Sequence, residues 1–365
     1  MKKPNSEVTL HIESLAYGGS GVARHEGKVW FVPHTIPGER IIAKAQHSKK
    51  SYVQARLVRV LTPSPDRVEA PCQHYTRCGG CSYQHIRYEE QIHWKTTQVQ
   101  EAFQRIGKIH TLPKIHTIAA PHPLHYRNRI RLHIQDGKPG FLAQGGHGFI
   151  PIRRCEIASE SINQRLSRLQ RHHLTGEHLT LRDRQGHQDP QGQNQKGFYQ
   201  TNDTVAALLL AEVEDFLKTS TAPHLLEAYC GAGAFAKKLR PHFQKIIGID
   251  WSEPAIENAN KDAQENEHYL CADVAKVLSE QLTAAHDTPT ELLLDPPREG
   301  LEKTIIPNLL AANHIVGITY VSCNPTTLAR DCALLQEKFS LSRLSVLDMF
   351  PQTASIETIV RLLRR

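Results

Sequence analysis

Three cysteines lie close together early in the chain, at Cys72, Cys78 and Cys81, with a pair of glycines between the last two. Adjacent glycines let the backbone turn tightly around a small centre. Clustered thiolates favour metal binding, and four of them hold either a tetrahedral zinc ion or an iron–sulfur cluster. Cys155 is the most credible fourth ligand, because the cysteines farther along belong to the edge of a predicted sheet. The spacing predicts a four-cysteine centre; zinc, an iron–sulfur cluster and three unrelated buried cysteines all stay open.

Cys323 is a candidate nucleophile of a different kind. It stands in Ser-Cys-Asn-Pro directly after an apolar run, where the next helix should begin. A thiolate there can add to an electrophilic ring carbon, such as carbon 6 of uracil, if the helix start lowers the pKa of the thiol. That addition activates carbon 5 toward a methyl sulfonium, and a base must then remove the proton from carbon 5. Glu357 is the candidate base, although a cysteine or glutamate taken singly is more often a packing or solvated residue.

Polar residues that follow neighbouring apolar runs are candidate cofactor ligands. Tyr229 precedes a Gly-Ala-Gly turn, which lets a nucleoside approach the backbone closely. Asp250 ends the next run and can accept hydrogen bonds from ribose hydroxyls, and Asp273 can face the adenine. Asp295 begins Asp-Pro-Pro-Arg, a stiff turn. Methyltransferases that act on amino groups usually have Asn-Pro-Pro and an aromatic residue at this point, so the motif argues against exocyclic-amine methylation.

The elements that must position these residues fall in the second half of the chain, residues 201–365. Short apolar runs alternate there with helical stretches. Such alternation predicts a mostly parallel sheet covered by helices, and ligands bind such sheets at the carboxyl ends of the strands. The predicted strands are residues 225–228, 246–250, 292–295 and 318–322.

Residues 1–62 predict a small β-barrel, because short alternating runs are separated by turns that contain glycine and proline. A basic surface with interleaved aromatic side chains is typical of RNA-binding barrels, and an ordinary solvated surface is the alternative. The basic and aromatic residues are Arg24, Lys28, Lys44, Lys49, Lys50, Arg56, Arg59, Tyr17 and Tyr52.

Residues 63–200 form the expected central α+β domain, which holds the four cysteines. Two prolines in Thr-Pro-Ser-Pro-Asp mark a linker at 62–66. Apolar residues at helical spacing predict a helix over 87–107, and alternation predicts antiparallel strands over 126–157. The polar stretch 170–197 predicts weak structure or exposed hairpins.

The whole chain has 365 residues, which suits two or three domains of about 150 residues each. Its formal charge is +7, from 44 Lys and Arg against 37 Asp and Glu, and this excess fits a polyanionic partner without requiring one. The 22 histidines stand mostly singly among polar residues and predict no site. The sequence has no signal peptide pattern and no run of about 20 apolar residues, so we expect a cytoplasmic protein with reduced cysteines and no membrane contact.

In combination, these motifs resemble the RNA 5-methyluridine (uracil-C5) methyltransferases. The resemblance runs over essentially the whole chain: a barrel similar to the OB-like TRAM domain, then the cysteine cluster, then the α/β half. Among the members of this family, the bacterial enzymes that act on 23S ribosomal RNA are the most similar. The motifs that carry the resemblance are Gly-Phe-Tyr-Gln-Thr-Asn at 197–202, Asp-Pro-Pro-Arg at 295–298, Ser-Cys-Asn-Pro at 322–325 and Met-Phe-Pro-Gln-Thr at 349–353.

The resemblance implies a fold class, cofactors and site residues. The fold would be α/β, with a TRAM-like barrel, a central α+β domain that contains an iron–sulfur cluster, and a Rossmann-like S-adenosylmethionine methyltransferase domain. Cys323 would be the nucleophile and Glu357 the base. The partner would be RNA, with 23S rRNA expected and tRNA as the alternative, and the chain would act as a monomer without an obligatory protein partner. The implied [4Fe-4S] ligands are Cys72, Cys78, Cys81 and Cys155, and the implied S-adenosylmethionine site includes Gln200, Tyr229, Asp250 and Asp295.

Two residues depart from the family pattern, and three other function classes stay open. Ser355 stands where His is common, and Ala234 stands where Asn is common in the glycine-rich turn. Either change can tune the base or the cofactor affinity without removing a chemical role. The other classes are a non-catalytic RNA-binding protein, a radical methylthiotransferase and a cytosine-C5 methyltransferase. Retention of Cys323 and Glu357 disfavours the first, four protein thiols disfavour the second, and the cysteine motifs disfavour the third.

Overall fold

The chain is described from a computed structural model, which defines residues 7–146, 148–183, 200–283 and 288–365. It forms two compact units, and the predicted barrel and central domain both contribute to the first. The first unit comprises Met1–Gln98, Pro121–Gly186 and Phe350–Ser355, and the second comprises Val99–Ala120, His187–Met349 and Ile356–Arg365.

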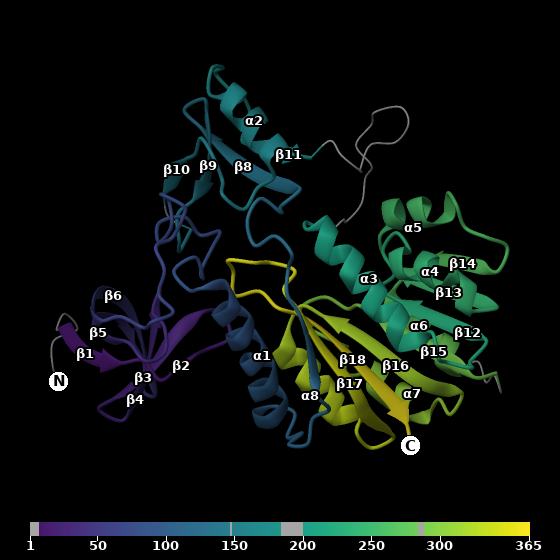
Figure 1. Cartoon of the computed structure of the whole chain (residues 1–365). Helices are drawn as coiled ribbons and strands as arrows, with labels where there is room; N and C mark the ends of the chain where they lie inside the picture. The colour runs from purple at the N-terminus through teal and green to yellow at the C-terminus, as the bar shows by residue number, and fades with distance from the viewer. Residues whose placement is uncertain (1–6, 147, 184–199, 284–287) are drawn as a thin grey trace. The chain divides into compact units, whose positions relative to one another are not determined.

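The first unit opens with a six-stranded sheet in the order β1-β5-β6-β4-β3-β2, as predicted for the barrel (Figure 1). Apolar side chains on alternate positions of these strands, among them Trp30, Val32 and Ile41, fill its core. Gly21 lies so close to Thr35 that a β-carbon there would overlap its hydroxyl. The strands are β1 (Glu7–His11), β2 (Ser14–Leu15), β3 (Ser20–His25), β4 (Lys28–Pro33), β5 (Arg40–Ser48) and β6 (Tyr52–Thr62).

The linker after the barrel is tied back to it by a buried carboxylate. Glu39, which is 0% exposed, accepts hydrogen bonds of 2.5 and 2.8 Å from the Arg67 guanidinium. The cysteine loop follows, and then α1 (Tyr88–Arg105), which confirms the predicted helix. The charge-assisted, bidentate pair of Glu39 and Arg67 fixes the direction in which the chain leaves the barrel.

A second sheet of the first unit has four antiparallel strands in the order β10-β9-β8-β11, and α2 packs its apolar side on it (Figure 1). The predicted antiparallel strands are confirmed. The expectation of weak structure over 170–197 is wrong for β11, which pairs with β8, and residues 184–197 lie outside the described part of the chain. The elements are β8 (Arg129–Gln135), β9 (Lys138–Leu142), β10 (Phe149–Pro151), α2 (Glu160–Leu169) and β11 (His178–Arg182).

The second unit is built on an eight-stranded sheet in the order β14-β13-β12-β15-β16-β18-β17-β7 (Figure 1). The first five of these strands are parallel, as predicted, and β18 and β17 continue the sheet antiparallel. Its strands are β7 (Ile115–Ile118), β12 (His224–Ala228), β13 (Lys245–Asp250), β14 (Glu267–Cys271), β15 (Thr290–Leu294), β16 (Ile315–Ser322), β17 (Phe339–Leu347) and β18 (Glu357–Arg364).

Helices flank this sheet and bury its apolar side chains in one core. Strands β12, β15 and β16 are buried along nearly their whole length, as expected for parallel strands covered on both faces. No helix in the described residues is long and apolar enough to cross a membrane. The helices are α3 (Asp203–Leu217), α4 (Ala234–Leu239), η1 (Arg240–His242), α5 (Glu253–Asn260), α6 (Val274–Thr283), α7 (Ile305–Ala311) and α8 (Pro325–Leu335).

Candidate active site and cysteine centre

The candidate nucleophile and base meet at one edge of the second unit's sheet. β16 ends at Ser322, β18 begins at Glu357, and the two strands run antiparallel with Ser322 opposite Thr358. This register places Cys323, the next residue, opposite Glu357, the preceding one. The Glu357 charge raises the pKa of the Cys323 thiol, so the two groups interact directly through space.

Burial dominates the electrostatics of this pair. It raises the pKa of Cys323, and Glu357 raises it further. The expectation that the start of α8 lowers the pKa of this thiol is therefore wrong in direction, because loss of water around the sulfur disfavours the thiolate. Burial also raises the pKa of Glu357 well above its usual value, and the Asp295 charge adds to the shift. Glu357 is 5% exposed, so little water reaches its carboxyl group.

Arg298 is a site residue that the sequence reasoning did not assign. Its side chain hydrogen-bonds the Cys323 thiol, and its charge lowers the pKa of both Cys323 and Glu357. Its carbonyl accepts hydrogen bonds from Asn324 Nδ2 at 3.0 Å and from Thr327 Oγ1 at 3.1 Å. These bonds tie the Asp-Pro-Pro-Arg turn to the start of α8. The signal available in the sequence was a cation directly after a rigid turn.

Asp250 ends β13, and Asp295 directly follows β15; these two strands lie on either side of β12. The two carboxyl groups interact electrostatically. Burial and the Asp250 charge raise the pKa of Asp295 to about 7. Asp250 Oδ2 accepts the N–H of Gly231 at 2.9 Å, and Oδ1 accepts the N–H of Ser252 at 2.8 Å. The Asp250 carboxylate is thus held at the glycine-rich turn, where a ribose would be recognised.

The glycine-rich turn itself is tightly built. Tyr229 has φ of 64°, and Gly233 has φ of 74° with no room for a side chain, since a β-carbon would lie 2.9 Å from the Tyr269 ring. Glu227 is buried with Oε2 accepting the Ala236 N–H at 2.9 Å, while Oε1 has no partner among the described residues. Burial raises the pKa of Glu227 to about 8. This buried acid beneath the turn was also missed from the sequence.

The other two predicted cofactor ligands, Asp273 and Gln200, lie near the starts of helices α6 and α3. Asp273 is exposed, and its Oδ1 accepts the Lys276 N–H at 3.0 Å, so it caps α6. Gln200 is half-buried just before Asn202, the N-cap of α3. The rest of its motif, residues 197–199, lies outside the described residues. The assignment of Asp273 and Gln200 to a cofactor site stays a prediction.

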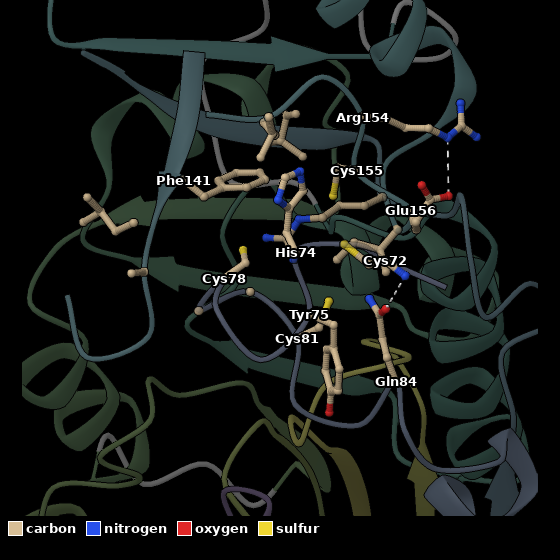
Figure 2. Close-up of a pocket in the computed structure, with 18 of the residues that line it drawn as sticks. Cys72, His74, Tyr75, Cys78, Cys81, Gln84, Phe141, Arg154, Cys155 and Glu156 are labelled. Carbon is tan, nitrogen blue, oxygen red and sulfur yellow. Dashed lines mark hydrogen bonds and ion pairs between the residues drawn. The ribbon is translucent and has the colours of Figure 1, made fainter. Parts of the chain in front are cut away.

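The four predicted metal-ligating cysteines, one of them distant in sequence from the other three, line one cavity of about 500 Å³ in the first unit (Figure 2). All four are free thiols. Burial raises the pKa of each thiol, that of Cys81 to about 12. A metal that binds here must displace these protons. The four are Cys72, Cys78, Cys81 and Cys155.

Each of these sulfurs receives N–H donors, which a neutral buried thiol does not require. Backbone N–H groups of His74 and Tyr75 point to Cys72, and that of Gly80 points to Cys78. Backbone N–H groups of Ile157 and Ala158 point to Cys155, and the Gln84 side chain bonds Cys81. Hydrogen bonds to sulfur are the surroundings in which iron–sulfur clusters are held and tuned. The donor set therefore fits a metal–thiolate centre.

The geometry also bears on which metal centre fits. Within the described residues, no three Cys, His, Asp or Glu side chains are placed to hold a single metal ion. A zinc ion needs its thiolates within about 2.3 Å of one point, whereas an iron–sulfur cluster spreads its thiolates over several iron atoms. This result shows no single-ion site among the described residues, and the [4Fe-4S] assignment stays a prediction.

Known proteins similar to this chain identify its family and its N-terminal domain. Residues 154–365 match the family model for tRNA (uracil-5-)-methyltransferase, and residues 2–58 match that for the TRAM domain. An RNA methyltransferase of Bdellovibrio bacteriovorus is 32% identical over 98% of this chain and 95% of its own. An RNA methyltransferase of Aquifex aeolicus is 30% identical over 97% of this chain and 98% of its own.

A solved structure shares the fold. The Pyrococcus abyssi tRNA (uracil-54, C5)-methyltransferase, in complex with S-adenosyl-L-homocysteine, superposes with a TM-score of 0.73. The match covers 98% of this chain and 100% of the other, at 22% identity. The extent of the family match and of the B. bacteriovorus relative leads to one conclusion: the chain belongs to the tRNA (uracil-5-)-methyltransferase family and is an RNA methyltransferase with an N-terminal TRAM domain.

Proposed function

We propose that this chain transfers a methyl group from S-adenosylmethionine to carbon 5 of a uridine in RNA. The observation that carries the proposal is the pairing of Cys323 with Glu357 across β16 and β18. Family membership supports uracil as the modified nucleobase and carbon 5 as the methylated atom. The P. abyssi protein, whose name gives uracil 54 and C5, supports them as well.

The reaction divides between these two residues. The Cys323 sulfur, as thiolate, forms a bond to carbon 6, and the ring electrons move to oxygen 4 as an enolate. Carbon 5 then takes the methyl group, which S-adenosylmethionine supplies as a sulfonium. Glu357, as carboxylate, removes the proton from carbon 5, and the sulfur–carbon bond breaks to restore the thiolate.

The electrostatics of the site suit this division. Arg298 favours the thiolate form of Cys323 and so offsets part of the effect of burial. The raised pKa of Glu357 makes its carboxylate a strong base once it has lost its proton. A uridine in structured RNA must first be unstacked to reach this edge of the sheet.

The proposed S-adenosylmethionine site lies along the ends of β12, β13, β14 and β15. Asp250 would accept hydrogen bonds from the ribose hydroxyls. The bonds that orient its carboxylate come from the backbone and leave lone pairs for a ligand. The other proposed contacts are Gln200, Tyr229, Asp273 and Asp295.

We also propose a [4Fe-4S] cluster on Cys72, Cys78, Cys81 and Cys155. The shared cavity and the N–H donors at each sulfur support it. Because Cys323 and Glu357 account for the chemistry, the cluster would hold the cysteine loop to the turn before α2 and orient RNA. Anaerobically prepared protein with stoichiometric zinc and no iron contradicts this assignment.

The proposed substrate is 23S rRNA, acted on by a monomer, and tRNA is the second candidate. The test is mass spectrometry of nucleosides from rRNA and tRNA of a strain that lacks the gene. We expect one 5-methyluridine to disappear from 23S rRNA and to return when purified protein and S-adenosylmethionine are added to that RNA. Loss from tRNA supports the second candidate, whereas loss of 5-methylcytidine or no loss in either RNA contradicts the proposed function.

A further inference from the structure

We propose that Gln84 tunes the electronic state of the cysteine centre and that Asn163 holds its fourth thiol in place, so that both are positioning residues of the cluster. This inference rests on the proposed [4Fe-4S] assignment. It concerns two buried amide side chains, neither of which belongs to the cysteine motif.

Gln84 bridges two of the cysteines. Its side chain is buried, at 2% exposure, and Oε1 accepts the backbone N–H of Cys72 at 3.2 Å (Figure 2). The side chain also hydrogen-bonds the Cys81 thiol. Because the amide oxygen is directed to Cys72, the amide N–H group is the donor to the sulfur.

This donor differs in kind from the donors at the other three sulfurs. Those are backbone N–H groups, whereas Gln84 is a side chain and is open to substitution. An N–H directed at a ligating sulfur withdraws electron density and favours the reduced cluster, which carries more negative charge. Replacing the N–H by a carboxylate oxygen does the opposite. Gln84 therefore sets the reduction potential through Cys81.

Asn163 acts on the distant ligand, Cys155. It lies on α2 at 3% exposure, and its Oδ1 accepts the Cys155 N–H at 2.9 Å. Its Nδ2 donates to the carbonyls of Cys155 and Ala158, both at 3.1 Å. One buried amide thus satisfies both peptide groups of Cys155 and closes the turn that carries it.

The consequence is a division of labour between the two amides. Cys155 comes from a segment far along the chain from the other three thiols, so its position depends on the turn before α2. Loosening that turn should speed loss of iron, because one of four ligands would leave more easily. It should not change the electron density on the remaining sulfurs. Gln84 governs the potential, and Asn163 governs retention.

The test uses the full chain, reconstituted anaerobically with iron and sulfide. The variants are Gln84→Glu and Asn163→Leu, with Gln164→Glu on the exposed side of α2 as the matched control. We expect Gln84→Glu to keep its iron but to have a more negative midpoint potential than both wild type and control. We expect Asn163→Leu to keep the wild-type potential but to release iron to a chelator about 10–100-fold faster.

Two further variants keep the test decisive if either change prevents folding. Gln84→Met removes the donor without adding charge and should still lower the potential. Asn163→Asp keeps the acceptor for the Cys155 N–H but loses the donor, and should still speed iron release. A Gln84 variant with the potential of the control, or an Asn163 variant with wild-type iron release, overturns its half of the inference. Wild-type protein that binds no iron instead overturns the cluster assignment itself.

Discussion

Glu357 lies opposite Cys323 across the antiparallel pair of β16 and β18, one position beyond the Ser322–Thr358 register pair. Because the strands run in opposite directions, the end of one and the start of the other share an edge of the sheet. A residue late in the chain thereby reaches the edge where parallel strands present their ligands. The proposed division of roles between Cys323 and Glu357 depends on this register.

Substitution of the two residues should stop the reaction at different stages. Cys323→Ala should form neither product nor covalent complex, because no bond to carbon 6 can be made. Glu357→Gln should methylate carbon 5 but remove its proton about 10²–10⁴-fold more slowly, so a methylated protein–RNA adduct should accumulate on a denaturing gel. Glu337→Gln, at an exposed carboxylate after the end of α8, serves as the control. Absence of any adduct with Glu357→Gln, wild-type release of methylated RNA by that variant, or label transfer by Cys323→Ala refutes the division of roles.

The pH dependence of adduct breakdown, the step that follows methyl transfer, should report the neighbours of Glu357. The active form of this base is the carboxylate, so the rate should rise with pH through its raised pKa. Asp295→Asn removes a negative neighbour, lowers the pKa of Glu357 and should move the rise to lower pH. Arg298→Gln removes a positive neighbour and should move it to higher pH. If the two substitutions move the midpoint of the pH profile in the same direction, or leave it unchanged, the proposed effects of these charges on Glu357 are wrong.

Asp250 should contribute strongly to cofactor affinity. Asp250→Ala removes charge-assisted hydrogen bonds to ribose and should cost about 1.5–3 kcal/mol of S-adenosylmethionine binding, measured by calorimetry. Asp262→Ala is the control, because Asp262 is 58% exposed and pairs with Lys237 on the surface. Wild-type affinity in Asp250→Ala eliminates the ribose assignment.

The barrel should supply part of the RNA affinity through phosphates. Lys49 and Lys50 are exposed between β5 and β6, and reversing both charges should weaken RNA binding. The salt dependence of binding should also flatten, by about 0.7–0.9 in slope for each phosphate that these lysines neutralise in the wild type. Lys245→Glu, at the amino end of β13, is the control. An unchanged salt slope in the double variant argues that RNA does not bind at this turn.

A buried ion pair should dominate the stability of the second unit. Arg361 donates to both carboxylate oxygens of Glu291 at 2.5 and 2.6 Å, and both side chains are almost fully buried. Arg361→Met leaves a buried charge and should cost about 3–5 kcal/mol in urea unfolding. Adding Glu291→Gln should recover part of that loss. If Arg361→Met alone is as stable as wild type, the prediction is wrong, and Glu291 has found another partner.

Four strands of the parallel half of the sheet were predictable, because they are apolar runs that end in polar residues. The edge strand β14, Glu-His-Tyr-Leu-Cys, does not have this pattern. β11, β17 and β18 were not predicted, since each depends on a partner distant in sequence and shows no distinctive local pattern. Glu357 could be named as the candidate base from its motif. Its position opposite Cys323 required the register.

The electrostatic surroundings were the least predictable part of the site. The direction of the Cys323 pKa shift depends on how much water the fold removes, and sequence position alone suggested the opposite sign. Asp273 illustrates a second difficulty, because an acid after a strand is equally a good helix cap. Gln84 and Asn163 carried no signal, since buried amides are recognised by what they contact.

The excursion of Phe350–Ser355 into the first unit constrains how the protein can be made. Gln352 exchanges hydrogen bonds with Gln91 on α1, and its carbonyl accepts the N–H groups of Ser82 and Tyr83. These partners are synthesised long before residue 352 leaves the ribosome. The N-terminal unit therefore stays incomplete, with the segment beside Cys81 unfinished, until residue 352 has been translated. Completion of the first unit, and of the proposed cluster site beside Cys81, is thereby placed after synthesis of Phe350–Ser355.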